Sequence, residues 1–316
     1  MKNKKLITVF GATGAQGGGL ARAILADNSS DFLVRVVTRD AYSKKAKEFK
    51  HLGAEVVVAN IDEPESIKNA IAGSYGVYFV TFFWEHFSVE KEQQEVKNFI
   101  EAARDASLQH IIWSTLEDTR EWIPLDDDRM PTLHGKYKVP HFDGKGAADK
   151  FFADAGLPAT CLRTSFYWDN FIYFGMGPKK ADDGNYYFAF PMDDKKLPGI
   201  AAEDIGKCAY GIFKRGSEFI GKTIGIAGEK LTGYEMAGKF SAALGKNVIF
   251  NNVTPEVYRN FGFPGADDLG NMFQFKRDFN DDFNANRSLE LSKELNPELQ
   301  SFDKWLSIHA AQIPLD

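Results

Sequence analysis

Residues 5–17 read Lys-Leu-Ile-Thr-Val-Phe-Gly-Ala-Thr-Gly-Ala-Gln-Gly and decide the fold. The apolar run 6–10 predicts a β-strand, and the periodic stretch 18–26 predicts a helix. Between them, Gly11, Gly14 and Gly17 form a Gly-x-x-Gly-x-x-Gly turn. Glycines at such a junction let backbone amides and the helix dipole approach a pyrophosphate closely. We therefore predict a dinucleotide site here, with a ligand-free glycine turn as the alternative.

The rest of the first half repeats this alternation of short apolar runs with longer amphipathic stretches. Further strands are expected at 33–38, 55–59, 77–81, 109–114 and 159–163, and further helices at 64–72, 89–106 and 145–155. Strands joined by helical crossovers form a doubly wound parallel sheet, the Rossmann fold. We predict an α/β protein with a nucleotide-binding domain over 1–164. A smaller mixed α/β domain over 165–316 would cover the strand ends, with an approximate boundary that the chain can cross.

Composition excludes several classes of protein. The chain has 316 residues with a net charge of −6 and 44% hydrophobic residues, which is typical of a globular protein with no broad basic surface for nucleic acid. Two cysteines and six scattered histidines give neither a disulfide framework nor a metal signature. Because no signal peptide or membrane span is apparent, we expect a cytoplasmic protein with no membrane or direct nucleic-acid partner. The oligomeric state is not predicted.

The end of the second expected strand bears on the choice of cofactor. NAD-binding proteins place an acidic residue there to bind the adenosine ribose, whereas an arginine nearby accommodates the extra phosphate of NADP. Here Arg39 follows the strand, with Asp40 as a competing carboxylate one residue later. We predict NADP(H), held by Arg39. Whether Lys44 and Lys45 also contact the 2′-phosphate stays open.

Residues after the other strands are expected to face the cofactor, because ligands of open α/β sheets bind at the carboxyl ends of the strands. These positions hold Asn60 and Ile61 beside the adenine, Thr81 after the fourth strand, and Ser114 at the end of the fifth. The aromatic residues Phe82, Phe83 and Trp84 would form an apolar wall there or belong to an ordinary core; both interpretations stay open.

His141 and Lys145 lie four residues apart at the start of a helix, so both side chains are expected on one face. Lys145 suits the hydroxyl groups of the nicotinamide ribose. His141, with an ordinary pKa of about 6.5, suits a proton donor near neutrality. A packed helix-start histidine is the alternative for His141.

These motifs together resemble the NmrA-like family of atypical short-chain dehydrogenase relatives, especially its NADPH-sensor branch. The resemblance spans most of the chain. The matching segments are Gly11-Ala-Thr-Gly-Ala-Gln-Gly17, Val36-Val-Thr-Arg39, Trp84-Glu85, Gln94-Glu-Val-Lys97, His141-Phe-Asp-Gly-Lys-Gly146, Gly262-Phe-Pro-Gly-Ala266 and Asn271-Met-Phe.

The resemblance implies a Rossmann domain that binds NADP(H), a smaller second domain, and a regulatory role in which cofactor occupancy controls protein partners. It also implies a set of cofactor-lining residues: Gly11, Thr13, Gly14, Ala15, Gln16, Gly17, Arg39, Asn60, Ile61, Thr81, Phe82, Phe83, Lys97, Lys145, Tyr167, Trp168, Asp169 and Asn170. Lys97 has an alternative as a solvated helix residue.

One departure from active short-chain dehydrogenases bears on mechanism. Those enzymes pair a proton-donating Tyr with a Lys four residues later and a Ser after the fifth strand. His141 stands in the Tyr place here, while Lys145 and Ser114 occupy the other two. The first hypothesis is therefore an NADP(H)-binding redox-sensing regulator with little or no dehydrogenase activity. The alternatives are an NADPH-dependent reductase of a small carbonyl, enone or quinone that uses His141, Lys145 and Ser114, and an interaction module with a vestigial site.

Overall fold

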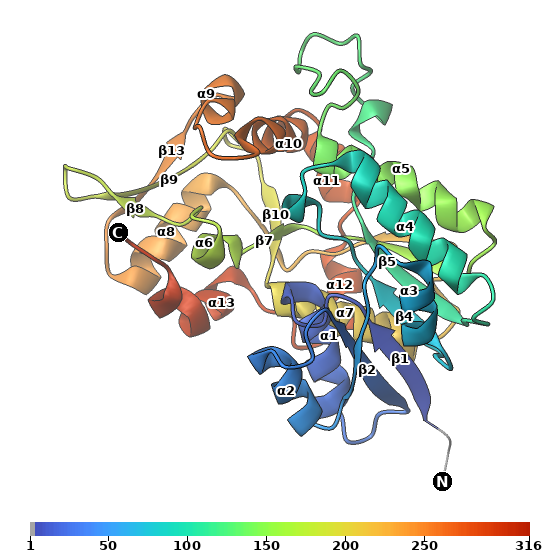
Figure 1. Ribbon diagram of the computed structural model, residues 1–316. Helices are drawn as coiled ribbons and strands as arrows, with labels where there is room; N and C mark the ends of the chain where they lie inside the picture. The colour runs from blue at the N-terminus through green and yellow to red at the C-terminus, as the bar shows by residue number, and fades with distance from the viewer. Residues whose placement is uncertain (1–3) are drawn as a thin grey trace.

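The computed structural model describes residues 4–316 and is built around a seven-stranded parallel sheet (Figure 1). The strand order is β11-β6-β5-β4-β1-β2-β3, and every neighbouring pair is parallel. The strands are β1 (Lys5–Val9), β2 (Phe32–Thr38), β3 (Glu55–Val58), β4 (Gly76–Phe79), β5 (His110–Thr115), β6 (Ala159–Arg163) and β11 (Thr223–Gly225). The six strands expected within 1–164 are present, and β11 adds a seventh from the second half of the chain.

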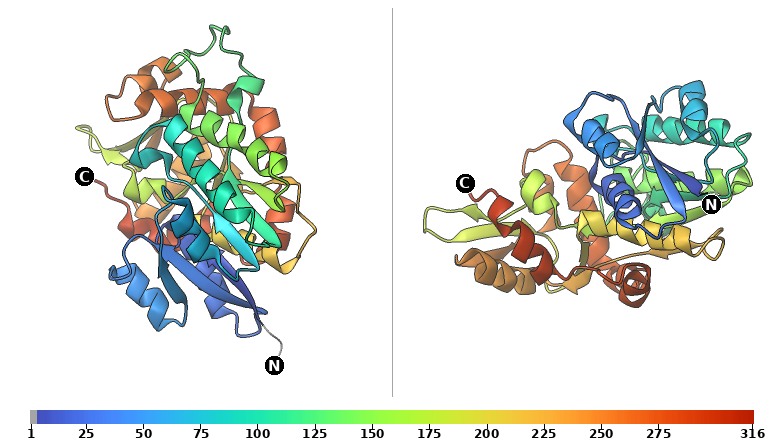
Figure 2. Two further views of the ribbon diagram at one scale, coloured as in Figure 1. Left: turned by 45° about the vertical axis from the view of Figure 1, so that its right-hand side comes forward. Right: turned by 90° about the horizontal axis from the view of Figure 1, so that it is seen from below.

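Helices cover both faces of this sheet, as Figures 1 and 2 show. One face carries α1 (Ala15–Ala26), α2 (Lys44–His51), α7 (Ala202–Lys214) and α12 (Leu289–Leu295). The other carries α3 (Pro64–Ile71), α4 (Val89–Ala103) and α5 (Pro140–Asp154). Each layer has its own apolar core against the sheet. This sandwich is the doubly wound fold predicted from the alternating pattern.

Glycines let α1 and α7 approach unusually closely. A Cβ atom on Gly19 would lie 2.3 Å from the backbone oxygen of Glu203, and one on Gly206 would lie 2.0 Å from the backbone nitrogen of Leu20. Neither distance leaves room for a side chain. Residues 202–225 therefore return to the first sheet and supply α7 and β11.

The second region combines two three-stranded sheets with helices. The sheets run β12-β10-β7 and β13-β9-β8. Their strands are β7 (Phe166–Tyr167), β8 (Lys179–Lys180), β9 (Tyr186–Phe190), β10 (Leu197–Ile200), β12 (Glu229–Leu231) and β13 (Val248–Asn252). The helices are α6 (Asn170–Tyr173), α8 (Gly233–Leu244), α9 (Pro255–Arg259), α10 (Ala266–Asp278), α11 (Asn280–Ala285) and α13 (Phe302–His309). Short 3₁₀ turns are η1 (Phe83–Glu85), η2 (Thr119–Glu121) and η3 (Ala310–Gln312).

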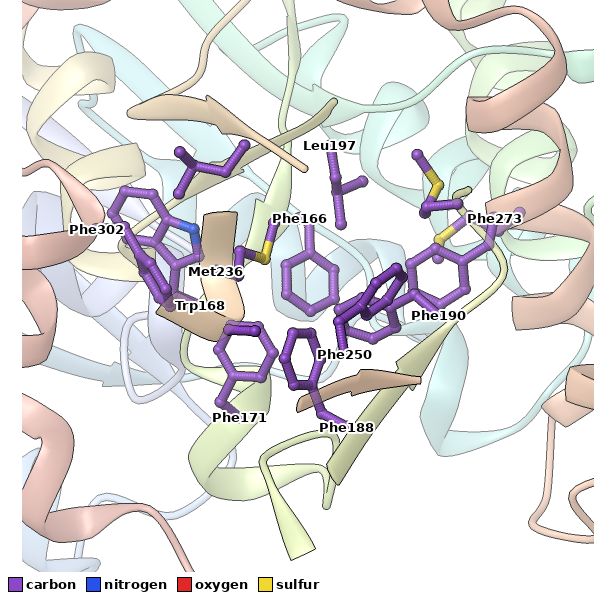
Figure 3. Packing of buried hydrophobic residues seen from close by; sticks show 14 of the residues in the cluster. Phe166, Trp168, Phe171, Phe188, Phe190, Leu197, Met236, Phe250, Phe273 and Phe302 are labelled. Atoms are coloured by element: carbon purple, nitrogen blue, oxygen red, sulfur yellow. The ribbon is translucent and has the colours of Figure 1, made fainter. Parts of the chain in front are cut away.

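An aromatic cluster forms the core of this second region, as Figure 3 shows. Phe171 packs edge-on against Phe240 with ring centroids 4.9 Å apart, and Phe190 stacks on Phe273 at 4.7 Å. Large aromatic side chains contribute much of the burial energy of a core and prefer such edge-on and offset contacts. Within residues 4–316, none of the helices has the length and apolar character required to cross a bilayer.

Candidate dinucleotide-binding site

The glycine turn lies between β1 and α1, as predicted. Gly11 has a φ of +65°, which favours glycine, and the Gly14 N–H donates to the Gly11 carbonyl at 2.9 Å. A Cβ atom on Gly17 would lie 2.7 Å from the oxygen of Gly11, so only glycine fits there. Gly14 caps α1 without a side chain. The first N–H groups of α1, at Ala15 and Gln16, have no intrahelical acceptor and can bind phosphate oxygens.

Four charged side chains lie on the predicted adenosine side of this turn. Arg39 follows β2 and forms an exposed ion pair with Glu85, which follows β4. Lys45 on α2 donates from Nζ to the backbone oxygen of Thr13 at 2.7 Å, so its ammonium group reaches the turn itself. Asp40 accepts the N–H of Tyr42 at 2.7 Å, which directs this carboxylate toward its own loop. Asn60 likewise serves its own loop, because its side-chain oxygen accepts the N–H of Asp62 at 3.1 Å.

Lys145, on the predicted nicotinamide side, forms a buried ion pair with Glu92. Its Nζ donates to Glu92 Oε1 at 2.7 Å and to Thr81 Oγ1 at 2.6 Å. The Thr81 hydroxyl in turn donates to Glu92 Oε1 at 2.8 Å. Glu92 is fully buried, whereas the Lys145 side chain retains 11% exposure. The structure brings Thr81 and Lys145 into contact at the strand ends, and Glu92 neutralises the lysine charge.

Close packing of α4 on α5 holds this ion pair in place. Gly144 faces α4, and a Cβ atom there would lie 3.1 Å from Glu92 Oε2, a buried oxygen that has no hydrogen-bond partner among residues 4–316. One turn further along α4, burial raises the pKa of Glu95 to about 7. Burial also lowers the pKa of His86, whose Nε2 lies 3.6 Å from Glu95 Oε1. The nicotinamide side thus rests on a layer of buried ionisable groups.

His141 is bound to a carboxylate from the second region of the chain. Its Nδ1 lies 2.6 Å from Asp268 Oδ1, and its backbone N–H donates to Asp268 Oδ2 at 3.1 Å. Because an ionised carboxylate only accepts, the Nδ1 position carries the proton. No hydrogen bond among residues 4–316 uses Nε2, and the side chain keeps 8% exposure. The ring centroids of Trp84 and His141 lie 4.7 Å apart.

Ser114 belongs to a third, separate network centred on Gln16. The Ser114 hydroxyl donates to Gln16 Oε1 at 2.7 Å, and the Tyr78 hydroxyl donates to the same oxygen. Gln16 Nε2 donates to the hydroxyl of Tyr167. Burial raises the pKa of Tyr78 and raises that of Tyr167 to about 12, so both phenols keep their protons. These contacts fix the side chain of Gln16 within the protein.

The structure brings only some of the remaining predicted residues to the site. Phe82 is 53% exposed at the strand ends, whereas Phe83 and Ile61 pack into apolar clusters. Lys97 is exposed on α4, and its Nζ lies 5.4 Å from the ring centroid of Phe151 on α5. This placement fits the alternative of a solvated helix residue.

The segment 167–170 splits in the same way. Tyr167 reaches Gln16, but the Trp168 side chain is fully buried in the second core, beside Phe302. Asp169 accepts the N–H of Ala202 at 2.8 Å, at the start of α7, and Asn170 begins α6. The side chains of Trp168 and Asp169 therefore serve packing and capping.

Sequence reasoning missed Glu92, Asp268 and the role of Glu85. Glu92 sits within Glu90-Lys-Glu-Gln-Gln-Glu95, where nothing distinguishes a buried glutamate from its exposed neighbours. Asp268 follows the Gly262–Ala266 motif, but its partner lies 127 residues away in the sequence. In residues 4–316, no group of His, Cys, Asp or Glu side chains is placed to hold a metal ion.

Comparison with known proteins identifies relatives across the whole chain. The model of the NmrA-like family matches residues 3–306. An NmrA-like family domain-containing protein from Dictyostelium discoideum is 28% identical over 262 residues, covering 80% of this chain and 82% of that protein. The NmrA-like family domain-containing oxidoreductase FrzB from Cladobotryum sp is 27% identical, covering 85% of this chain and 83% of its own.

Among solved structures, the negative transcriptional regulator NmrA in complex with NADP superimposes with a TM-score of 0.78 at 20% identity, covering 98% of this chain and 97% of NmrA. NmrA has also been crystallised with NAD. At this identity the likeness shows a shared fold.

Proposed function

The chain belongs to the NmrA-like family, and from this premise we propose that it is an NADP(H)-binding regulator with little or no dehydrogenase activity. Three things support nucleotide binding: the glycine turn, the free N–H groups at the start of α1, and Arg39 at the end of β2. NmrA, which shares the fold, binds both NADP and NAD in crystals.

One observation carries the regulatory half of the proposal. The three side chains in the catalytic places are each bound to a different partner: Ser114 to the half-buried Gln16, Lys145 to the buried Glu92, and His141 to the buried Asp268. In an active short-chain dehydrogenase the Tyr, Lys and Ser in these places act together, with the Tyr as the proton donor. Here the Lys145 charge is neutralised by Glu92, and no contact joins the three among residues 4–316. Such an arrangement is suited to holding a cofactor rather than to transferring a proton.

Regulation further requires that the cofactor bind one conformation of the protein more tightly than another. The contact between His141 and Asp268 joins the nicotinamide side to α10 of the second region. We infer that nucleotide binding is reported to protein partners through this contact. Hydrogen exchange with and without NADPH tests the inference, because α10 and the loop before it should gain protection when the nucleotide binds.

The test of the regulator against an enzyme is a measurement of NADPH binding and turnover in one sample. Calorimetry establishes binding, and loss of the reduced-nicotinamide absorbance with a panel of quinones, enones and aldehydes measures turnover. We expect saturable binding without turnover. Rapid NADPH oxidation by the wild type would refute the regulator, and failure to bind either nucleotide would favour an interaction module with a vestigial site.

A second candidate, an NADPH-dependent reductase, is favoured by the geometry of His141. A histidine whose Nδ1 is fixed by a carboxylate presents Nε2 as a defined proton donor or acceptor. FrzB is described as an oxidoreductase. If turnover is found, His141→Ala and Lys145→Ala should each reduce it by about 10²-fold or more. Unchanged turnover in both variants would rule out this mechanism.

A further inference from the structure

The charged groups on the adenosine side are arranged around the end of β1. In the sheet, β1 lies between β2 and β4 (Figure 1). Arg39 comes directly after β2, and Glu85 comes after β4 in the turn η1. Their ion pair therefore spans the strand that leads into the glycine turn. Lys45 reaches the same turn from α2, through its bond to the Thr13 oxygen.

Both cations are bound to partners that a phosphate can replace. The side chains of Arg39 and Glu85 are 74% and 48% exposed, and exposed ion pairs are weak because water screens them. Lys45 is exposed and is held by a neutral carbonyl oxygen. A phosphate monoester carries close to two negative charges near neutrality and forms stronger, charge-assisted hydrogen bonds with both types of cation. Replacement therefore favours the phosphate.

Given Arg39 as the predicted contact to the 2′-phosphate, we propose that Glu85 is an internal anion which occupies Arg39 until the phosphate binds, and that Lys45 is the second cation of this subsite. This inference rests on the proposed NADP(H) function and deepens it. Glu85 lowers the affinity for NADPH because its bond to Arg39 must break. It has no such effect on NADH, which lacks the phosphate. The balance between Glu85, Arg39 and Lys45 thus sets the preference for the phosphorylated cofactor.

Asp40 does not compete for this role in the same way. Its Oδ1 accepts the N–H of Tyr42, and Ser43 donates from Oγ to the Asp40 backbone oxygen at 2.9 Å. These bonds shape the turn before α2. The carboxylate that faces Arg39 is Glu85, which lies 46 residues further along the chain.

The test compares dissociation constants for NADPH and NADH in matched variants of the full chain. Glu85→Gln should tighten the binding of NADPH about fivefold and leave the binding of NADH unchanged. This factor corresponds to the removal of a competing interaction worth about 1 kcal/mol. Lys45→Ala should weaken the binding of NADPH about tenfold, again without a change in the binding of NADH. Lys47→Ala removes the same charge from the same helix and is the control, for which we expect no change in the ratio of the two constants.

Each contrary outcome overturns a defined part of the inference. If Glu85→Gln leaves the ratio of the two dissociation constants unchanged, Glu85 does not act as an internal anion. If Lys45→Ala and Lys47→Ala have equal effects, Lys45 is not the second cation of the subsite. A variant that weakens NADPH and NADH equally has lost general binding or folding, which also contradicts a phosphate-specific role. If the wild type binds neither nucleotide, the proposed function itself fails. If the wild type binds normally but the variants leave the ratio of the two dissociation constants unchanged, only this inference fails.

Discussion

The two sides of the proposed nucleotide site differ in how their charges are held. At the adenosine side, the Arg39 side chain is 74% exposed and has one exposed acidic partner. At the nicotinamide side, Lys145 is 11% exposed and shares its buried partner, Glu92, with Thr81. Charges in water interact weakly, whereas buried charges depend on their partners for stability. We infer that the first side is built to exchange ligands and the second to keep a fixed geometry.

The largest expected effect lies at the buried pair. Glu92→Gln leaves the Lys145 ammonium without its countercharge in a nearly dry environment. Breaking a buried pair in this way typically costs about 3–5 kcal/mol in the free energy of unfolding. Urea denaturation measures the loss. Glu101→Gln, an exposed change on the same helix, is the control and should cost less than about 0.5 kcal/mol. Equal, small losses in both variants would mean that the nicotinamide side is not rigidly held.

Glu95 gives the same side a characteristic pH dependence. Its folded pKa of about 7 exceeds the ordinary value of 4.5, so the folded chain holds a proton that the unfolded chain releases between these pH values. Stability should therefore fall as the pH rises from about 4.5 to 7, by up to roughly 3 kcal/mol from this group.

Glu95→Gln isolates this effect, because glutamine does not titrate. The difference in unfolding free energy between variant and wild type should grow in favour of the variant across that pH range. His86 contributes with the opposite sign below its ordinary pKa of 6.5, since burial lowers its folded pKa, but it is present in both proteins. A difference that does not vary with pH would place Glu95 in water-like surroundings.

The contact between His141 and Asp268 should have the next largest effect on the free energy of unfolding. Asp268→Asn removes the charge and faces the His141 N–H with an amide that cannot accept both bonds, so we expect a loss of about 2 kcal/mol. The exposed neighbour Asp267 provides the control, as Asp267→Asn keeps the oxygen that accepts the N–H of Asp268. A double-mutant cycle with His141→Ala should give a coupling energy of at least about 1 kcal/mol. Strictly additive effects would show that the two residues are not coupled.

The sheet and the glycine turn could be predicted because their signals are local. The apolar run at 6–10 and the glycine spacing depend on neighbours in sequence, and the structure places β1, the turn and α1 there. The seventh strand of this sheet, β11, comes from the second half of the chain and was not predicted to join it. Its pairing with β6 depends on a chain crossing of some 60 residues, which no local pattern encodes.

The partners at the nicotinamide side could not be predicted for a related reason. His141 and Lys145 were correctly placed on one helix, α5. However, their neutralising partners come from α4 and α10, and which glutamate or aspartate is buried depends on how those helices pack. Lys97 lies beside Phe151 of α5, and its contact with the cofactor stays a prediction.

The smallest expected effect on stability tests the other half of the comparison. Glu85→Gln breaks the Arg39 ion pair, yet both side chains remain solvated, so the free energy of unfolding without nucleotide should change by less than about 1 kcal/mol. The same substitution should shift the ratio of NADPH to NADH affinity, so stability and specificity separate at this residue. A loss of stability as large as that of Glu92→Gln would show that Arg39 and Glu85 hold structure as the buried pair does. The adenosine side would then not be free to exchange its internal anion for a phosphate.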